Sequence, residues 1–298
     1  MTSIKAWYMT TGEAGFRTQA RGLSERVAGE ARELVVGLRP FWRRVPAALT
    51  PDPLSKLDPS KDRPAPPWPD LLVTCGRRTT ALSIAIRRLS AGRTLTVHVQ
   101  DPLTRAAAFD FIVAMAHDTI AGPNVMKVVT ALHDVTPAKL EIARADWGPR
   151  LKADARPLVG VLLGGATRRE GFTAEKAGPL AEGLAQLRRE GGMRIVVTAS
   201  RRTPPEAMAR LRSTFKGDPD VSLWGPEDEN PYLGILGLAD RLVVTSDSVS
   251  MISEALATRA GVEVFGEAGN ARHAQFLGDL TRQGLIRSFT GDPSAPPA

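Results

Sequence analysis

Residues 158–198 read LVGVLLGGATRREGFTAEKAGPLAEGLAQLRREGGMRIVVT, and this stretch decides the fold class. Leu158–Leu163 is an uninterrupted apolar run that ends at two glycines, as a fully buried strand does. Residues 174–190 have the apolar spacing of a helix and end at Gly191-Gly192, and residues 194–198 are a second apolar run. A strand, a helix and a second strand of this kind predict a parallel sheet that helices cover on both faces.

The same alternation of strands and helices extends in both directions along the chain. Before this stretch we expect strands at 4–9, 33–38, 71–74, 95–99, 111–114 and 125–131, with helices at 16–28 and 79–89. After it we expect strands at 221–224, 242–245 and 262–265, with helices at 203–215, 232–238, 251–258 and 271–283. Thr203 and Glu206 form the pattern of a capping box at the start of one of these helices. Two such runs predict two Rossmann-like α/β domains, 1–150 and 157–298, with a boundary inside 146–157.

Composition limits the kinds of protein that this chain can be. The 298 residues include 43% hydrophobic and 24% charged side chains, which is ordinary for a soluble protein of two domains. One cysteine excludes a disulfide framework, and the four histidines are far apart in sequence, so we expect no metal and no cofactor. The uncharged run 157–167 is too short to cross a bilayer, and residues 1–12 lack the apolar core of a signal peptide. We therefore expect a cytoplasmic protein.

The positive charge is concentrated in the first half of the chain. Residues 1–150 carry 21 Lys and Arg against 14 Asp and Glu, whereas residues 151–298 carry 18 of each. The segment 38–46 mixes arginines with aromatic residues, a combination that suits an anionic membrane surface. We therefore predict that five of its residues face the inner membrane, where the protein lies peripherally: Arg39, Phe41, Trp42, Arg43 and Arg44.

Three alternatives to this membrane surface remain open. Single-stranded nucleic acid also binds arginines mixed with aromatic residues, but it is the less favoured partner. The aromatic side chains of the segment can instead return to the core of the domain. A genome rich in arginine codons can also account for the positive excess, because arginine outnumbers lysine 31 to 8 in the chain.

Ligands of open parallel sheets bind beyond the carboxyl ends of the strands, so each strand-to-helix turn is a candidate site. The turn richest in hydroxyl groups is Thr245-Ser246-Asp247-Ser248-Val249-Ser250, and Glu254 follows one turn into the next helix. Amides and hydroxyls at such a turn suit a phosphate group, and a neighbouring carboxylate can accept hydrogen bonds from a ribose diol. The alternative is that the polar residues only cap the helix and that Glu254, as an exposed carboxylate, complements the helix dipole.

Two other turns carry further candidates. Gly164 and Gly165, after the apolar strand, allow a ligand to approach the backbone closely. No GxGxxG pattern or Walker lysine follows them, which argues against a Rossmann dinucleotide site and a P-loop. Glu13 lies in the turn after the first strand and is a candidate general base. A purely structural turn is the alternative in both places.

Residues 230–255 begin with Asn230-Pro231-Tyr232 and continue through Ala239-Asp240-Arg241 to the turn at Thr245 and to Glu254. This block resembles the signature of the "elongated mitochondria" family of mitochondrial fission proteins, which has bacterial members in the alphaproteobacteria. Further blocks that resemble the family are Gln100-Asp101-Pro102, His117-Asp118, Gly122-Pro123-Asn124-Val125 and Leu163-Gly164-Gly165. Near the N-terminus the family carries Asn-Gln, where this chain has Thr18-Gln19.

The family in turn resembles glycosyltransferases of the GT-B fold, in which two Rossmann-like domains face a cleft. This resemblance implies that the C-terminal domain binds a nucleotide-diphosphate sugar through Gly164, Gly165, Thr245, Ser246, Ser248, Ser250 and Glu254. It implies that the N-terminal domain holds the acceptor, often a lipid at a membrane. The implied activity is metal-independent sugar transfer with Glu13 as the general base. A membrane-associated adaptor without catalysis and a nucleotide-sugar epimerase are the alternatives.

Overall fold

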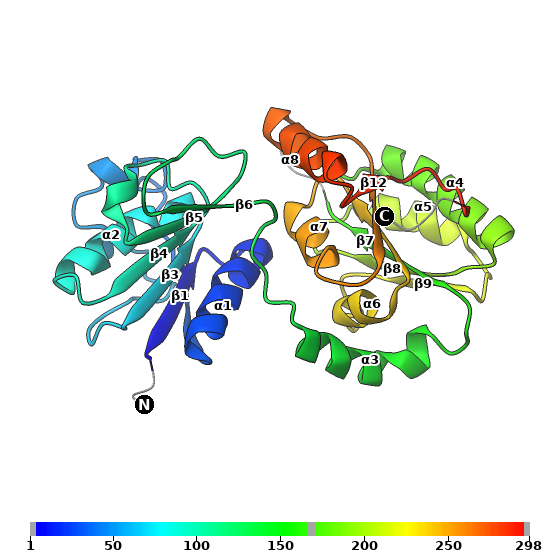
Figure 1. Cartoon of the computed structure of the whole chain (residues 1–298), viewed down its shortest axis with the longest axis horizontal. Coiled ribbons are helices and arrows are strands. Elements are labelled where there is room, and N and C mark those ends of the chain that lie inside the picture. The colour runs from blue at the N-terminus through cyan, green and yellow to red at the C-terminus, as the bar shows by residue number, and fades with distance from the viewer. Residues whose placement is uncertain (1–3, 166–170, 295–298) are drawn as a thin grey trace. The chain divides into compact units, whose positions relative to one another are not determined.

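The computed structural model describes residues 4–165 and 171–294, and the chain forms two compact units, Met1–Asp134 and Val135–Ala298 (Figure 1). Each unit contains a six-stranded sheet in which the paired strands are parallel. These sheets, with helices packed on them, confirm the predicted α/β class with two Rossmann-like domains. Among the described residues, no helix combines the length and the apolar character needed to cross a membrane.

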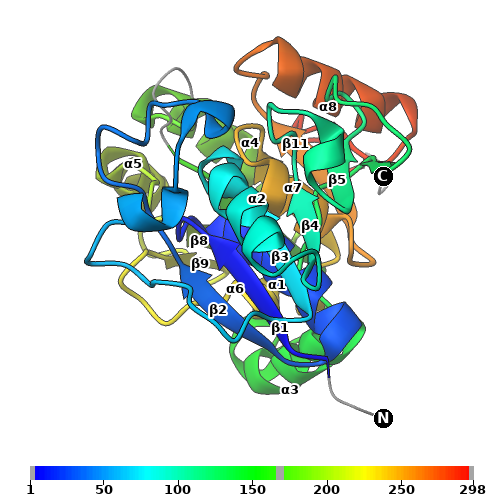
Figure 2. The same cartoon turned by 90° about the vertical axis from the view of Figure 1, so that its left-hand side faces the viewer.

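The first unit has the strand order β2-β1-β3-β4-β5-β6. Its strands are β1 (Ala6–Thr10), β2 (Ala31–Val35), β3 (Leu71–Cys75), β4 (Leu95–Val99), β5 (Phe111–Met115) and β6 (Val125–Val128). Helices α1 (Ala14–Ala28) and α2 (Thr80–Leu89) cover opposite faces, because successive residues of β1 point to opposite sides of the sheet. Trp7 packs in one core cluster with Leu82 of α2, and Tyr8 packs in another with Ala20 of α1. In Figure 2 helix α2 lies in front of the sheet of the first unit.

The connections of the first unit contain short 3₁₀ turns at Ala47–Leu49, Pro53–Lys56, Arg77–Thr79 and Ala106–Ala108. Strand β2 ends at Val35, three residues earlier than predicted. After that residue the chain turns away from the sheet, and Leu38 forms an isolated antiparallel bridge with Leu57. The order of strand connections changes direction between β1 and β3, which is the switch point of this sheet.

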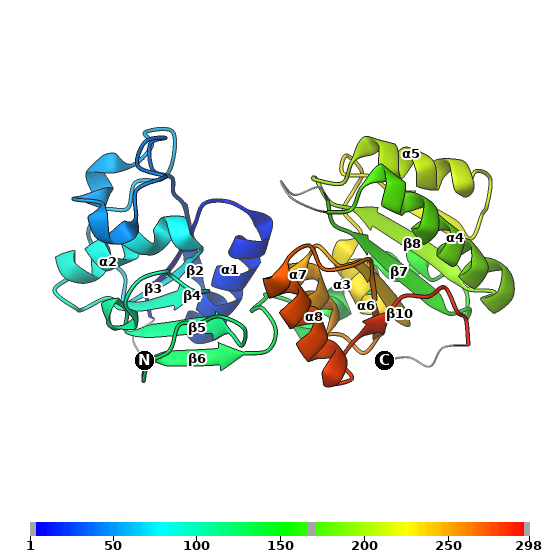
Figure 3. The same cartoon turned by 90° about the horizontal axis from the view of Figure 1, so that it is seen from above.

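The second unit has the strand order β12-β11-β10-β7-β8-β9. Its strands are β7 (Leu158–Leu163), β8 (Arg194–Ala199), β9 (Val221–Trp224), β10 (Arg241–Thr245), β11 (Gly261–Phe265) and β12 (Arg287–Ser288). Its helices are α3 (Pro137–Leu151), α4 (Ala174–Gly191), α5 (Pro205–Thr214), α6 (Tyr232–Leu238), α7 (Val249–Ala255) and α8 (Ala271–Arg282). Helices α4 and α5 lie on one face of the sheet, and α3 and α6 lie on the other (Figure 3). This is the doubly wound dinucleotide-fold order, and its switch point lies between β7 and β10.

Helix α3 was missed by the sequence analysis, because Gly148 and Pro149 are typical of a linker. Thr136 caps this helix by accepting a hydrogen bond from the amide of Lys139 at 3.2 Å. Its buried residues recur at a spacing of three or four and form one apolar face: Leu140, Ala143, Trp147 and Leu151. Trp147 packs directly on Gly234 of α6, where a Cβ atom would overlap the indole. Pro149 stands inside the last turn of the helix, where it removes one backbone donor from the helical hydrogen bonds.

The division between the two units therefore differs from the expected boundary inside 146–157. Because α3 packs against α6, the whole helix belongs to the second unit, and the division falls after Asp134. The break in the sequence pattern at 146–157 marks the end of α3 and the start of β7 rather than a border between domains.

Candidate functional site

The two turns predicted to bind a ligand in the second unit meet at the switch point between β7 and β10. The amide of Gly164 donates to Thr245 Oγ1 at 2.8 Å, and the amide of Gly165 donates to Asp247 Oδ2 at 2.9 Å. Strands β7 and β10 are paired neighbours, so both turns leave the carboxyl edge of the sheet side by side. The structure thus brings together the two segments that the sequence analysis assigned to one site.

The glycines of the first turn are required by contacts within the protein. A Cβ atom at Gly164 would overlap the carboxylate of Asp247, and one at Gly165 would overlap the backbone of Arg202. The close approach that glycine permits is therefore made by neighbouring protein groups, and both glycine amides are already hydrogen-bonded. Direct contact of these glycines with a ligand stays a prediction.

Thr203 belongs to the same cluster, and its predicted part in a capping box is wrong. Its hydroxyl donates to the carbonyl of Gly164 and accepts from the amide of Ser200 at 2.9 Å. Helix α5 begins at Pro205 with Pro204 as its cap, and no side chain caps it. A carbonyl group at the end of β7 needs a hydrogen-bond donor, and the Thr203 hydroxyl donates to it instead of capping the helix.

The hydroxyl groups of the β10–α7 turn differ in the bonds that they already make. Ser246 donates its proton to the carbonyl of Glu267 at 2.6 Å. Ser248 is the N-cap of α7 and accepts from the amide of Met251 at 3.3 Å. The side chain of Ser250 forms no hydrogen bond among the described residues. Because a hydroxyl has a single proton to donate, Ser248 and Ser250 can still donate to a phosphate group, whereas Ser246 cannot.

The variant Ser248→Ala is expected to lower the free energy of unfolding by about 0.5–2 kcal/mol, because it removes the N-cap of α7. Urea unfolding without any ligand measures this loss. Ser250→Ala is the matched control in the first turn of the same helix, and its effect should stay below about 0.5 kcal/mol. Equal losses in the two variants would contradict the capping role of Ser248.

Glu254 is buried, with 5% of its surface exposed, so the expectation of an exposed carboxylate is wrong. Its position near the end of α7 places it among Ile252, Ser253 and Ala255, which are also buried. Its carboxylate accepts a hydrogen bond from the hydroxyl of Tyr232. A carboxylate offers about four lone-pair positions, so a bond from the protein is compatible with a further bond from a ribose hydroxyl.

Tyr232 was not among the predicted site residues. It starts α6, and its amide donates to Asn230 Oδ1 at 3.1 Å in a local turn. Its hydroxyl reaches Glu254 across 22 positions of sequence. The only sequence signal for this residue was its place in the block 230–255, because the contact itself depends on how α6 and α7 pack.

Glu13 lies in the turn between β1 and α1, at the carboxyl edge of the first sheet. Its side chain is exposed, and its carboxylate accepts a hydrogen bond from the hydroxyl of Thr11. This turn is at the switch point between β1 and β3, where doubly wound sheets hold ligands. The role of Glu13 as a general base stays a prediction.

The segment 39–44 is partly exposed and partly tied to the core of the first unit. Phe41 is 69% exposed, and the three arginines of the segment are exposed. Trp42 is half-buried against the core cluster that contains Leu38, and the ammonium of Lys56 lies 5.1 Å from the centre of its ring. Arg43 Nη2 lies 3.2 Å from Asp58 Oδ2. One aromatic residue of the segment thus returns to the core, and the other remains at the surface.

Among the described residues, no three His, Cys, Asp or Glu side chains are grouped closely enough to hold a metal ion. His98 on β4 is fully buried, and its Nδ1 atom lies 2.8 Å from Thr74 Oγ1. Burial lowers the pKa of His98 to about 3, because the imidazolium form would lose its hydration.

Solved structures of other proteins share this fold along almost the whole chain. UDP-GlcNAc 2-epimerase from Methanocaldococcus jannaschii is 11% identical, with a TM-score of 0.59 over 97% of this chain and 90% of that chain. UDP-GlcNAc 2-epimerase from Neisseria meningitidis, in a structure bound to UDP-GlcNAc, is 11% identical. Its TM-score is 0.56 over 97% of this chain and 89% of that chain. These likenesses show the GT-B-like fold that the sequence led us to expect.

The sequence itself matches known relatives. The mitochondrial fission protein ELM1 of Arabidopsis thaliana is 30% identical over 247 residues, which are 75% of this chain and 58% of that protein. The chain therefore spans less than two thirds of the length of that relative. The model of the family "Mitochondrial fission ELM1" matches residues 14–297, which confirms the resemblance seen in the block 230–255. The chain belongs to the mitochondrial fission ELM1 family.

Proposed function

We propose that the second unit binds a nucleotide-diphosphate sugar at the carboxyl ends of β7 and β10, and that the protein transfers this sugar to an acceptor. The observation that carries the proposal is the meeting of the two predicted turns at the switch point, where doubly wound sheets hold nucleotides. Support also comes from the UDP-GlcNAc 2-epimerases, which share the fold over 97% of the chain.

Each polar residue of the site has a separate part in this proposal. Ser248 and Ser250 donate hydrogen bonds to the diphosphate, and Glu254 accepts one from a ribose hydroxyl. Ser246 holds the turn in place because it already donates its proton to Glu267. Thr245 has the same part because it is 2% exposed and accepts from the amide of Gly164. Side chains rather than the helix dipole carry phosphate binding, because α7 has only seven residues.

In the transfer step, an acceptor hydroxyl attacks the anomeric carbon while the bond from that carbon to the diphosphate oxygen breaks. A general base takes the proton of the acceptor, and we propose Glu13 for this role because it is exposed at the carboxyl edge of its own sheet. The diphosphate leaves with the extra negative charge, which preorganised hydroxyl donors stabilise. We place the acceptor at a membrane because Phe41 and the neighbouring arginines are exposed.

Two variants are expected to separate ribose binding from phosphate binding. Glu254→Gln should weaken the binding of UDP-GlcNAc, UDP and uridine by about tenfold or more. The reason is that a hydrogen bond to a charged acceptor contributes about 1.5–3 kcal/mol. Ser250→Ala should weaken the binding of UDP-GlcNAc and UDP but leave the binding of uridine unchanged, because it removes only a hydrogen-bond donor to the phosphate. Titration calorimetry measures all three ligands.

Ser213→Ala, an exposed serine on α5, is the control for these titrations and should bind as the wild type does. Circular dichroism checks that Glu254→Gln keeps its fold, since glutamine can still accept from Tyr232. If Ser250→Ala weakened uridine as much as UDP, or if both variants bound as the wild type, the residue roles proposed here would be wrong.

A nucleotide-sugar epimerase is the second candidate, and one observation favours it. The two solved structures described above are both UDP-GlcNAc 2-epimerases and align with nearly the whole chain. An epimerase inverts carbon 2 of the sugar without any acceptor, whereas a transferase releases UDP only when an acceptor is present. Proton NMR of UDP-GlcNAc incubated with the protein alone therefore separates the two. Binding without turnover of either kind would favour the adaptor.

A further inference from the structure

We propose that a pocket in the first unit binds a phosphate group through four arginines, Arg43, Arg44, Arg77 and Arg78. The pocket has a volume of about 290 Å³. Two of the arginines come from the loop after β2, and two come from the 3₁₀ turn that directly follows β3. The pocket therefore lies at the carboxyl edge of the first sheet, and it does not depend on the nucleotide site proposed in the other unit.

The charge of this pocket is not balanced by its own lining. The remaining lining residues are apolar except for Thr50, and none is a carboxylate. Arg43 forms an ion pair with Asp58, in which Nη2 lies 3.2 Å from Oδ2. In the described part of the chain Arg44, Arg77 and Arg78 form no ion pair. Cationic side chains that line one small pocket repel one another, so an anion bound in the pocket would relieve that repulsion.

A phosphate fits this arrangement better than a carboxylate does. Each guanidinium presents a planar fork of N–H donors that pairs with two oxygen atoms of an anion. A carboxylate has two oxygens and one negative charge, whereas a phosphate monoester has three terminal oxygens and bears close to two negative charges. Arginines that line one pocket from two separate segments can therefore share one phosphate.

Exposed apolar side chains adjoin the pocket and favour a phosphate carried on a lipid. Leu103 lines the pocket and is 64% exposed. Phe41 and Leu49 stand next to lining residues in sequence, and each is 69% exposed. Apolar side chains beside basic ones insert at the boundary between lipid headgroups and acyl chains. A phosphate monoester at a lipid surface would engage the arginines and these side chains together.

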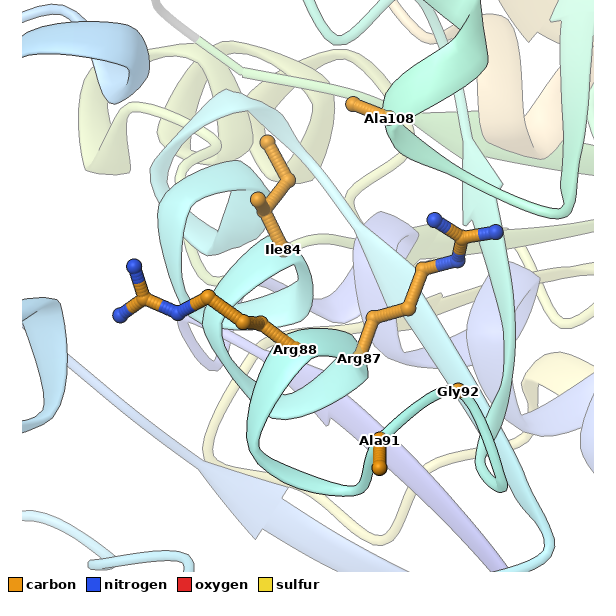
Figure 4. A pocket seen from close by; sticks show the side chains of 6 residues that line it. All are labelled: Ile84, Arg87, Arg88, Ala91, Gly92 and Ala108. Carbon is orange, nitrogen blue, oxygen red and sulfur yellow. The ribbon is translucent and has the colours of Figure 1, made fainter.

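Another hollow in the same unit lacks this combination. It has a volume of about 370 Å³ and lies beside the second half of α2 (Figure 4). Arg87 is engaged by Asp110 at 2.8 Å, and Figure 4 shows the side chains of Arg87 and Arg88 extending to opposite sides. The charges there are partly neutralised and do not converge.

The test compares Arg77→Gln/Arg78→Gln with Arg26→Gln/Arg63→Gln. The control removes two exposed arginines that do not line the pocket and form no ion pair among the described residues. The probes are phosphatidylcholine vesicles that contain either phosphatidic acid or phosphatidylglycerol at matched surface charge, and inorganic phosphate in solution. The wild type should bind phosphatidic acid vesicles more tightly than phosphatidylglycerol vesicles. The pocket variant should lose this binding by about tenfold or more, and the control by less than about threefold.

Arg77→Lys/Arg78→Lys keeps the charge but removes the planar fork, so its binding should fall between wild type and the glutamine variant. A different result is that the wild type binds inorganic phosphate, the pocket variant does not, and neither kind of vesicle is preferred. The pocket would then bind a soluble phosphate. Equal losses in the pocket and control variants, or no binding of any probe by the wild type, would overturn the proposal. UDP-GlcNAc binding should be the same in all of these variants, so a failure of the nucleotide proposal is seen separately.

Discussion

Replacing Glu263 by leucine is expected to lower the free energy of unfolding by about 3–5 kcal/mol. Glu263 on β11 is 1% exposed, and its Oε1 atom accepts from Arg241 Nη2 at 2.7 Å and from Arg287 Nε at 2.8 Å. Arg241 is itself only 6% exposed, so the substitution leaves a buried cation without its carboxylate. Because Arg241 starts β10 and Arg287 lies on β12, removing the Glu263 carboxylate also weakens the contacts of β11 with both neighbouring strands.

Chemical unfolding of the variants measures this effect. Adding Arg241→Met to Glu263→Leu should restore much of the stability, because an apolar pair carries no buried charge. Glu229→Leu is the control, since Glu229 pairs with Arg150 at the surface and should contribute less than about 1 kcal/mol. A loss at Glu263 no larger than the loss at Glu229 would contradict this assignment.

Lowering the pH below 6.5 is expected to destabilise the first unit through His98. The folded pKa of this buried histidine is about 3, against an ordinary value of 6.5. Between these two values the unfolded chain binds a proton that the folded chain does not bind. The stability linked to His98 is therefore fully present above pH 6.5 and falls by about 1.4 kcal/mol for each unit that the pH decreases.

Urea unfolding of the wild type and of His98→Gln at about pH 7 and about pH 5 tests this linkage. Carboxylates titrate in both proteins, so their contributions cancel in the comparison. From about pH 7 to about pH 5 the free energy of unfolding of the wild type should fall by about 2 kcal/mol more than that of the variant. About 1.5 units of this pH range lie below the ordinary pKa of histidine. Parallel pH profiles for the two proteins would show that His98 does not carry the effect.

Much of the fold could be predicted because its signals are local. The apolar run of β7 ends at glycines, and β7, β9 and α6 have the bounds expected from the sequence. Helix α3 could not be predicted in the same way, because Gly148 and Pro149 are local breakers. The helix persists through them since Trp147 packs on Gly234, a contact that only the folded chain creates.

The meeting of the two candidate turns could be predicted from the sequence, but the contacts of their side chains could not. The rule that ligands bind at the carboxyl ends of parallel strands placed Gly165 and Asp247 at one edge, and the structure joins them. The burial of Glu254 against Tyr232 depends on how two helices pack. The arginine pocket likewise combines loops that follow β2 and β3, and no local pattern indicates that they line one pocket.

Titration calorimetry of the wild type with UDP-GlcNAc, followed by other UDP-, GDP- and ADP-sugars, tests the central proposal most directly. We expect saturable binding of at least one of these donors, one molecule per chain, with a dissociation constant below about a millimolar. Glu254→Gln should weaken that binding by about tenfold or more. No heat of binding with any of these donors at millimolar concentration would contradict the nucleotide-sugar proposal.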